Sequence, residues 1–219
     1  GAGAGERSPP HPRTAGRRGT AYDPPVDDSP GCGVDLCWIP LGAGGNGYVR
    51  LNGRLYERAK AVRERRRPLA LYHTALVVRA PAGGHIVECA WPSPDADVAT
   101  RGVVVEGPVF AAGLGRFRPF RYEVRCWRGG VIPDLAQAVG GPQAIGSDAA
   151  QAQRLLDLAP AVPALTWGRA ADGAGEMWNS NSVISWLLAR AGFPMGALGP
   201  PEGGRAPGWQ AGLVVAGAA

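Results

Sequence analysis

The sequence predicts an α+β fold in which an antiparallel β-sheet packs against helices, and three observations lead to this prediction. A segment with helical spacing, residues 51–67, precedes the first extended segments. Apolar, β-rich runs then follow one another across turn residues, as is typical of antiparallel strands. Helical patterns return later, at residues 148–158 and 178–190. The order helix, antiparallel strands, helices indicates the α+β class.

The composition fits one domain of ordinary size. The chain has 219 residues, and 45% of them are hydrophobic, so a core can form. Glycine (34) and proline (21) are abundant, so much of the chain is expected in loops, turns or tails. Residues 1–31 predict a disordered Gly/Pro/Arg-rich segment. Residues 32–193 are expected to form the domain, and residues 194–219 a Gly/Pro-rich tail with Trp209 as a docking point.

The charge, the hydropathy and the cysteines give no indication of a membrane protein or of a metal-binding protein. The net charge is +5, and Lys60 is the only lysine. Arginine can mark phosphate or carboxylate partners, but these arginines are scattered, which favours a compositional bias. No run of about 18 apolar residues occurs, so no transmembrane segment is expected. No signal peptide is visible, which favours the cytoplasm. The four cysteines lack zinc-site spacing, so neither a metal nor another cofactor is expected: Cys32, Cys37, Cys89 and Cys126.

Residues 51–67 are predicted to be helical. Apolar residues recur there at helical spacing: Leu51, Leu55, Ala59 and Val62. Pro68 stops the helix. Arginines close it where the helix dipole is negative, and they either bind an acidic partner or form a solvated helix terminus: Arg63, Arg65, Arg66 and Arg67. The preceding glycine-rich stretch, residues 42–47, lacks the features of a phosphate-binding loop and is expected to be a flexible loop.

The central third of the chain predicts strands. Residues 69–79 and 85–91 are apolar and β-rich, and the Pro-Ala-Gly-Gly turn between them predicts a hairpin. Residues 102–106 and 120–127 predict further strands. The last of these alternates, with one face made by Phe120, Tyr122, Val124 and Cys126. Its other face is made by Arg121, Glu123 and Arg125.

Two helices are predicted after the strands. Ser147 is expected to cap a helix from residue 148 to about 158. The second helix covers residues 178–190 and ends at Gly192, a suitable left-handed stop. Its buried stripe is expected to consist of Val183, Ile184, Leu187, Leu188 and Ala191.

Polar residues at the start of the second helix are the candidate site. Ser180 precedes Val183 and Ile184 by three and four residues, so its side chain is expected to share their buried face at the positive end of the helix dipole. Such a residue is either part of a plain cap or a nucleophile. Asn179 is either the cap or, like Asn181, a donor to an oxyanion.

Two residues of the hairpin complete the candidate site. His73 lies in an apolar strand and is either a core residue or a general base. Glu88 lies in the neighbouring strand, where a carboxylate needs a partner. Pairing across the turn could bring Glu88 near His73, giving with Ser180 the general arrangement of nucleophile, base and orienting carboxylate.

Residues 73–78 and 86–92 resemble the histidine hairpin of the circularly permuted papain-like fold, which includes permuted NlpC/P60 proteins and lecithin:retinol acyltransferase-like enzymes. In that group the cysteine nucleophile comes last, at a helix start in an Asn-Cys motif. The Asn179-Ser180 pair is similar to that motif, with serine in place of cysteine. The resemblance covers roughly residues 68–192, and it implies a papain-like core.

The resemblance implies hydrolysis or acyl transfer at an amide, ester or thioester carbonyl, with Ser180 as nucleophile, His73 as base and Glu88 as orienting group. Tyr72 and Trp178 would then line the substrate pocket. Because serine replaces cysteine, three explanations stay open: a serine hydrolase, an engineered replacement, or a pseudoenzyme that binds a peptide, an acyl group or a protein. Nucleic acid is the least supported partner, because no recognised nucleic-acid-binding motif accompanies the basic residues.

Overall fold

The computed structural model describes residues 31–43, 47–92, 101–132 and 134–218, and for residues 47–50 it describes the backbone alone. The expected disordered segment, apart from Gly31, lies outside the described residues, as do residues 44–46 of the glycine-rich loop. The described part is α+β, with a sheet that is antiparallel except for one short strand. Across these ranges, no helix has both the length and the apolar character needed to span a bilayer.

Seven strands form the sheet within the described ranges; six of them follow one another in the spatial order β4-β5-β3-β2-β1-β6, and β7 lies off this path. The bounds are β1 (Gly33–Pro40), β2 (Ala70–Ala80), β3 (Gly83–Ala90), β4 (Val103–Pro108), β5 (Arg121–Arg128) and β6 (Gln143–Gly146). The short β7 (Gly204–Arg205) pairs in parallel with the start of β2. Strands β2 and β3 form the predicted hairpin, and Gly83 supplies the positive φ of 116° that its tight turn requires.

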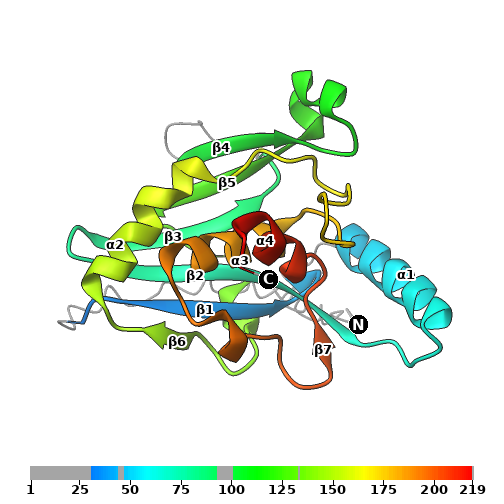
Figure 1. Ribbon diagram of the computed structural model, residues 1–219, viewed down its shortest axis with the longest axis horizontal. Helices are drawn as coiled ribbons and strands as arrows, with labels where there is room; N and C mark the ends of the chain where they lie inside the picture. The colour runs from blue at the N-terminus through cyan, green and yellow to red at the C-terminus, as the bar shows by residue number, and fades with distance from the viewer. Residues whose placement is uncertain (1–30, 44–46, 93–100, 133, 219) are drawn as a thin grey trace, which may run out of the picture.

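The sheet has two different faces, because successive side chains of a strand point to opposite sides. One face carries Leu36 and Leu76 and is covered by helices α2 (Ala149–Leu158), α3 (Ser180–Ala191) and α4 (Trp209–Ala216), as Figure 1 shows. The opposite face carries Cys37 and Ala75 and is covered by the segment that follows β5, through Ile132 and Leu135. The fold is therefore helices, sheet and an irregular third layer.

Helix α3 is the centre of the helical layer. The five residues of its predicted stripe are all buried, and so are the residues on its other sides from Ser180 to Leu188. Helix α4 covers its outer side at close range: a Cβ added to Gly212 would lie 2.0 Å from Oγ of Ser185. Gly192 ends α3 with a φ of 87°, as predicted.

The C-terminal segment was expected to be a tail, and the structure corrects this. Trp209 and Leu213 of α4 are buried, and the ring of Trp209 lies 5.0 Å from that of Trp38 on β1. The domain therefore continues to α4. The sequence indicates the docking point at Trp209, but a helix of eight residues is too short for a clear periodic signal.

Helix α1 (Gly47–Arg63) begins earlier and ends earlier than the predicted segment 51–67. Its leucines do not face the protein: Leu51 and Leu55 are each 56% exposed, and Val62 is 79% exposed. The inward side instead carries small residues and a carboxylate, at Gly53, Glu57 and Ala61. A Cβ at residue 53 would lie 2.4 Å from Cδ2 of Leu41, so the Leu41 side chain would have to shift if residue 53 were larger.

Two further local predictions need correction. The cap of α2 is Asp148, whose carboxylate accepts a hydrogen bond from the N–H of Gln151 at 2.8 Å, and not Ser147. Phe120 lies in a 3-10 turn before β5 and is exposed. On the charged face of strand β5, Glu123 and Arg125 are both buried and form an ion pair with each other.

Candidate functional site

The polar stretch at the start of α3 is a capping box. The side-chain oxygen of Asn179 accepts hydrogen bonds from the N–H groups of Asn181 at 2.9 Å and Ser182 at 3.4 Å. The hydroxyl of Ser182 accepts in return from the N–H of Asn179 at 3.0 Å. The same hydroxyl donates to the carbonyl of Gly208 at 2.7 Å. Two N–H groups of the first turn of α3 are therefore satisfied by the side chain of Asn179.

Asn181 fixes α3 to the sheet. Its amide nitrogen donates to the carbonyls of Tyr72 at 3.0 Å and Pro207 at 2.9 Å. Its side-chain oxygen accepts from the hydroxyl of Thr74 at 3.0 Å. The amide of Asn179 also donates to the carbonyl of Pro207, at 2.8 Å. Both amides hold backbone groups, and Asn181 has no N–H left for the expected contact with an oxyanion.

Ser180 is the first residue of α3 and is buried. Within the part of the chain that the structure describes, its hydroxyl makes no hydrogen bond. The expected general base, His73, does not contact the start of α3. The β2 side chain that reaches this helix is Thr74.

His73 and Glu88 lie on the opposite face of the sheet from α3. On β2, Thr74 and Leu76 face the helices, so the alternating position His73 faces the irregular layer. On β3, Val87 faces the helices and Ile86 the irregular layer, which places Glu88 on the same side as His73. The structure therefore places α3, with Ser180, on one side of the sheet and the side chains of His73 and Glu88 on the other side.

His73 has a different carboxylate partner from the predicted one. Its Nε2 lies 3.2 Å from Oδ2 of Asp134, a residue of the irregular layer. Burial opposes ionisation of Asp134, but the hydrogen bond and charge of His73 outweigh it, and the pKa of Asp134 lies below its ordinary value. Asp134 could not be assigned from the sequence, because it is 61 residues from His73 along the chain.

Glu88 belongs to a buried chain of ion pairs. Its carboxylate accepts from Arg125 at 3.3 Å, Arg125 also donates to Glu123 at 2.9 Å, and Arg101 donates to Glu123 at 2.6 Å. Burial raises the pKa of Glu88 above its ordinary value, although Arg125 opposes the rise. Charged side chains that are buried away from water need ion-pair partners. This need explains why each of these four side chains is paired.

Tyr72 and Trp178 are buried core residues of the described structure. Trp178 is fully buried, and its indole N–H donates to the hydroxyl of Tyr122 at 3.1 Å. Tyr72 is buried under Gly204, where an added Cβ would lie 2.3 Å from its ring. The structure therefore places both rings in the core, where Trp178 contacts β5 and Tyr72 lies against β7.

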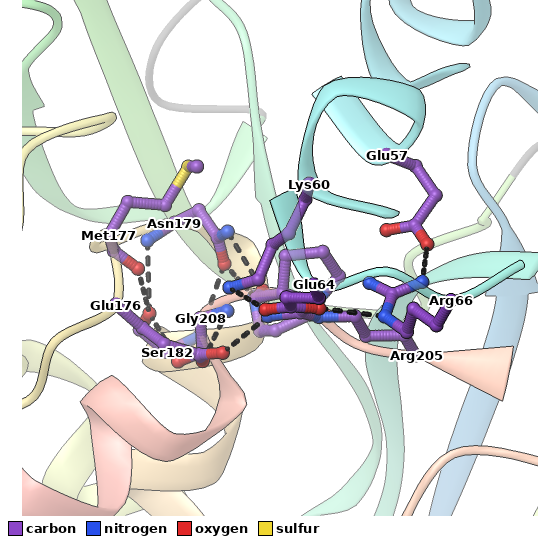
Figure 2. Close-up of polar contacts among 12 residues, drawn as sticks. Glu57, Lys60, Glu64, Arg66, Glu176, Met177, Asn179, Ser182, Arg205 and Gly208 are labelled. Atoms are coloured by element: carbon purple, nitrogen blue, oxygen red, sulfur yellow. Dashed lines mark hydrogen bonds and ion pairs between the residues drawn. The ribbon is translucent and has the colours of Figure 1, made fainter. Parts of the chain in front are cut away.

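A second polar network connects α1 to the start of α3, and sequence patterns did not indicate it. Figure 2 shows it running from Glu57 and Arg66 through Glu64 and Arg205 to Glu176. Arg66 pairs with Glu57 and donates to Glu64 at 2.7 Å, and Arg205 contacts Glu64 at 3.7 Å and Glu176 at 2.9 Å.

The network ends at the turn before α4. The carboxylate of Glu176 accepts from the N–H of Gly208 at 2.9 Å. The carbonyl of that same Gly208 accepts from the capping residue Ser182 (Figure 2). Helix α1 and the capping box of α3 are therefore tied together through charged side chains.

A cavity of about 460 Å³ lies between α1 and the strand ends of β1 and β2. Its lining is mostly apolar, from Pro40, Leu41, Pro68, Leu69, Ala70 and Leu71. Arg54 and Arg58 of α1 form a charged edge, and neither has an ion-pair partner within the described ranges. The size lies within the range of about 300–1,000 Å³ that is usual for small-ligand sites.

Glu57 forms the polar side of this cavity. It is 2% exposed, and one carboxylate oxygen accepts from Arg66 and from the N–H of Leu69. Burial opposes its ionisation, but these hydrogen bonds keep the pKa of Glu57 below its ordinary value. Its other oxygen, Oε2, has no hydrogen-bond partner in the described structure. An ionised carboxylate with an unsatisfied oxygen is unusual in a protein interior.

Among the described residues, no group of three or more histidine, cysteine or acidic side chains is arranged to hold a metal ion. Comparisons of the chain with protein-family models, with curated proteins and with solved structures found no match.

Proposed function

We propose that this chain is a non-catalytic binding module and not a Ser180-dependent hydrolase or acyltransferase. One observation carries the proposal: the sheet separates α3, with Ser180, from His73 and Glu88. A serine hydroxyl is a poor nucleophile unless a base lies within about 3 Å of it. The polar groups around Ser180 hold the helix cap, the turn at Pro207 and strand β2 instead.

We also infer a distant kinship with the permuted papain-like fold. The order of elements supports it, because a histidine-bearing hairpin comes first and a helix with an Asn-Ser start packs on that hairpin later. The contact between hairpin and helix start is made by Thr74 and Asn181. Thr74 follows His73 by one residue, and Asn181 follows Ser180 by one residue. This is consistent with a pseudoenzyme that keeps the fold but not the catalytic contacts.

The ligand that best fits the cavity beside α1 has an apolar body and a carboxylate. Its walls are leucine and proline side chains, which favour an aliphatic group. Arg54 and Arg58 are spaced i, i+4, so their guanidinium groups lie on one side of α1 and can both reach a carboxylate. A fatty acyl carboxylate and the apolar C-terminus of a peptide share this chemistry.

The absence of serine chemistry is tested with a fluorophosphonate probe, which phosphonylates an activated serine as the serine oxygen displaces fluoride from phosphorus. We expect no labelling of the native protein above that of a Ser180→Ala variant. Labelling that is present in the native protein and lost in Ser180→Ala would overturn the non-catalytic assignment.

Ligand binding is tested by calorimetry with decanoate and, in a separate arm, with a short peptide ending in leucine. We expect one of the two to bind, and the double variant Arg54→Gln/Arg58→Gln to bind about tenfold less tightly or worse, since each charge-assisted hydrogen bond is worth about 1.5–3 kcal/mol. Arg154→Gln, an exposed arginine of α2, is the matched control. Absence of binding in both arms, or equal weakening by the control, would reject the cavity as the site.

A further inference from the structure

The loop between β4 and β5 carries an unusual group of exposed aromatic side chains. Residues 109–120, called the finger from this point, project from the end of the sheet beyond β4 in Figure 1. The chain has four phenylalanines. Three of them lie on the finger, with Phe110 60% exposed, Phe117 48% exposed and Phe120 37% exposed. Exposed aromatic groups of this kind mark contact surfaces more often than isolated exposed residues do.

The backbone at Phe110 gives independent support. Its φ is 63°, a left-handed value that bulky residues rarely adopt. The N–H of Ala111 bonds to the carbonyl of Val109 at 2.8 Å, which closes a tight turn around Phe110. The N–H of Phe110 donates a hydrogen bond to the carbonyl of Trp167 at 3.0 Å, and Nε of Arg169 donates to the carbonyl of Phe110 at 2.6 Å. These two hydrogen bonds hold the turn in place. The fold thus stabilises a strained backbone and leaves the ring of Phe110 in solvent.

The charges of the finger all have one sign. Residues 109–120 contain no acidic side chain, whereas Arg116 and Arg118 are both exposed. The guanidinium of Arg116 lies 4.8 Å from the ring centre of Phe117, so positive charge and apolar surface adjoin. The complementary partner is therefore anionic and has an apolar interior.

We propose that the finger is an anchor that inserts into the interface of an anionic lipid bilayer. Aromatic rings are favoured at the boundary between headgroups and acyl chains, and arginines are attracted to anionic headgroups. A projecting loop suits insertion, whereas stacking of nucleic-acid bases commonly uses rings on the surface of a sheet. The anchor does not involve the cavity beside α1, because the two share no residue.

The test is co-sedimentation of the full chain with vesicles. We expect binding to vesicles of phosphatidylcholine and phosphatidylserine, and weaker binding to vesicles of phosphatidylcholine alone. The double variant Phe110→Asn/Phe117→Ser is expected to bind the anionic vesicles at least about tenfold less, because two rings no longer leave water. Arg116→Glu is expected to weaken binding to the anionic vesicles alone. Val139→Ser is the matched control, being 44% exposed outside the finger.

A second measurement separates anchoring from folding. Asparagine tolerates a positive φ better than phenylalanine, so Phe110→Asn should leave the melting temperature unchanged or raise it while vesicle binding falls. The proposal is overturned if the double variant and Val139→Ser bind alike, or if the native protein binds a single-stranded oligonucleotide and not the vesicles. Decanoate binding in the cavity is independent of either result.

Discussion

Replacing Asn181 with alanine separates the structural account of the α3 start from the catalytic one. Asn181 is 3% exposed, and its side chain makes three hydrogen bonds, to Thr74, Tyr72 and Pro207. In the catalytic account, the amide of Asn181 donates a hydrogen bond to an oxyanion. Replacing Asn181 then reduces turnover and leaves stability unchanged. In the structural account its loss detaches α3 from β2.

The expected loss of stability in Asn181→Ala follows from these three hydrogen bonds. Each buried hydrogen bond contributes about 1 kcal/mol net, with a spread of about 0.5 kcal/mol. Three lost bonds, with the Thr74 hydroxyl and the Tyr72 carbonyl left unpaired, lower the free energy of unfolding by about 2–4 kcal/mol. For a domain of this size each kcal/mol shifts the melting temperature by about 2–4 °C, so a decrease of roughly 4–16 °C is expected.

The assay is urea denaturation and thermal melting of three variants in parallel. Ser180→Ala removes a hydroxyl with no hydrogen bond in the described structure, so its stability should stay within about 0.5 kcal/mol of the native protein. Asn52→Ala, on the exposed side of α1, controls for the loss of an amide as such. The reasoning is refuted if Asn181→Ala is as stable as Asn52→Ala, or if Ser180→Ala is the most damaging of the three.

Three further predictions concern pH, capping and burial. Burial raises the pKa of Glu88, so the native state holds this proton to higher pH than the unfolded chain does, and stability should fall as pH rises from about 4.3 through the raised value. Glu88→Gln should flatten that part of a stability profile measured by urea denaturation, and an unchanged slope would contradict this. Asp148→Ala should cost about 0.5–2 kcal/mol by loss of the α2 cap, and Ser147→Ala close to nothing; the reverse order in thermal melting would restore Ser147 as the cap. Leu55→Gln, on the outer side of α1, should change stability by less than about 0.5 kcal/mol, whereas the fully buried Leu187→Ala should cost about 2–5 kcal/mol, and equal losses would place α1 in the core.

The elements whose signals are local were predictable. The hairpin follows from two apolar runs across Gly83, and α3 follows from its polar start, its apolar spacing and the stop at Gly192. The structure confirms each of these. Strand β6 is four residues long and α4 is eight, so neither is long enough to show a clear period. The partners of Arg205 and Asp134 also could not be predicted from the sequence, because they come from distant parts of the chain.

The candidate site shows where sequence reasoning stops. A histidine, a carboxylate and a polar helix start were visible as residue types in the expected order, but the face of β2 that carries His73 was not. A strand reverses its sides with every residue, so a displacement by one position moves a side chain across the sheet. His73 and Thr74 are neighbours in the sequence and belong to different layers of the protein.

The sequence by itself determined the α+β class, the hairpin, and a capped, buried helix beginning near Ser180, because periodicity, turns and caps act within about ten residues of the chain. The tertiary structure alone decided that α3 meets Thr74 through Asn181, that His73 pairs with Asp134, and that the leucines of α1 and the phenylalanines of the finger face solvent. These outcomes depend on strand register and on which layer covers each face, and both are set by contacts between residues far apart in sequence.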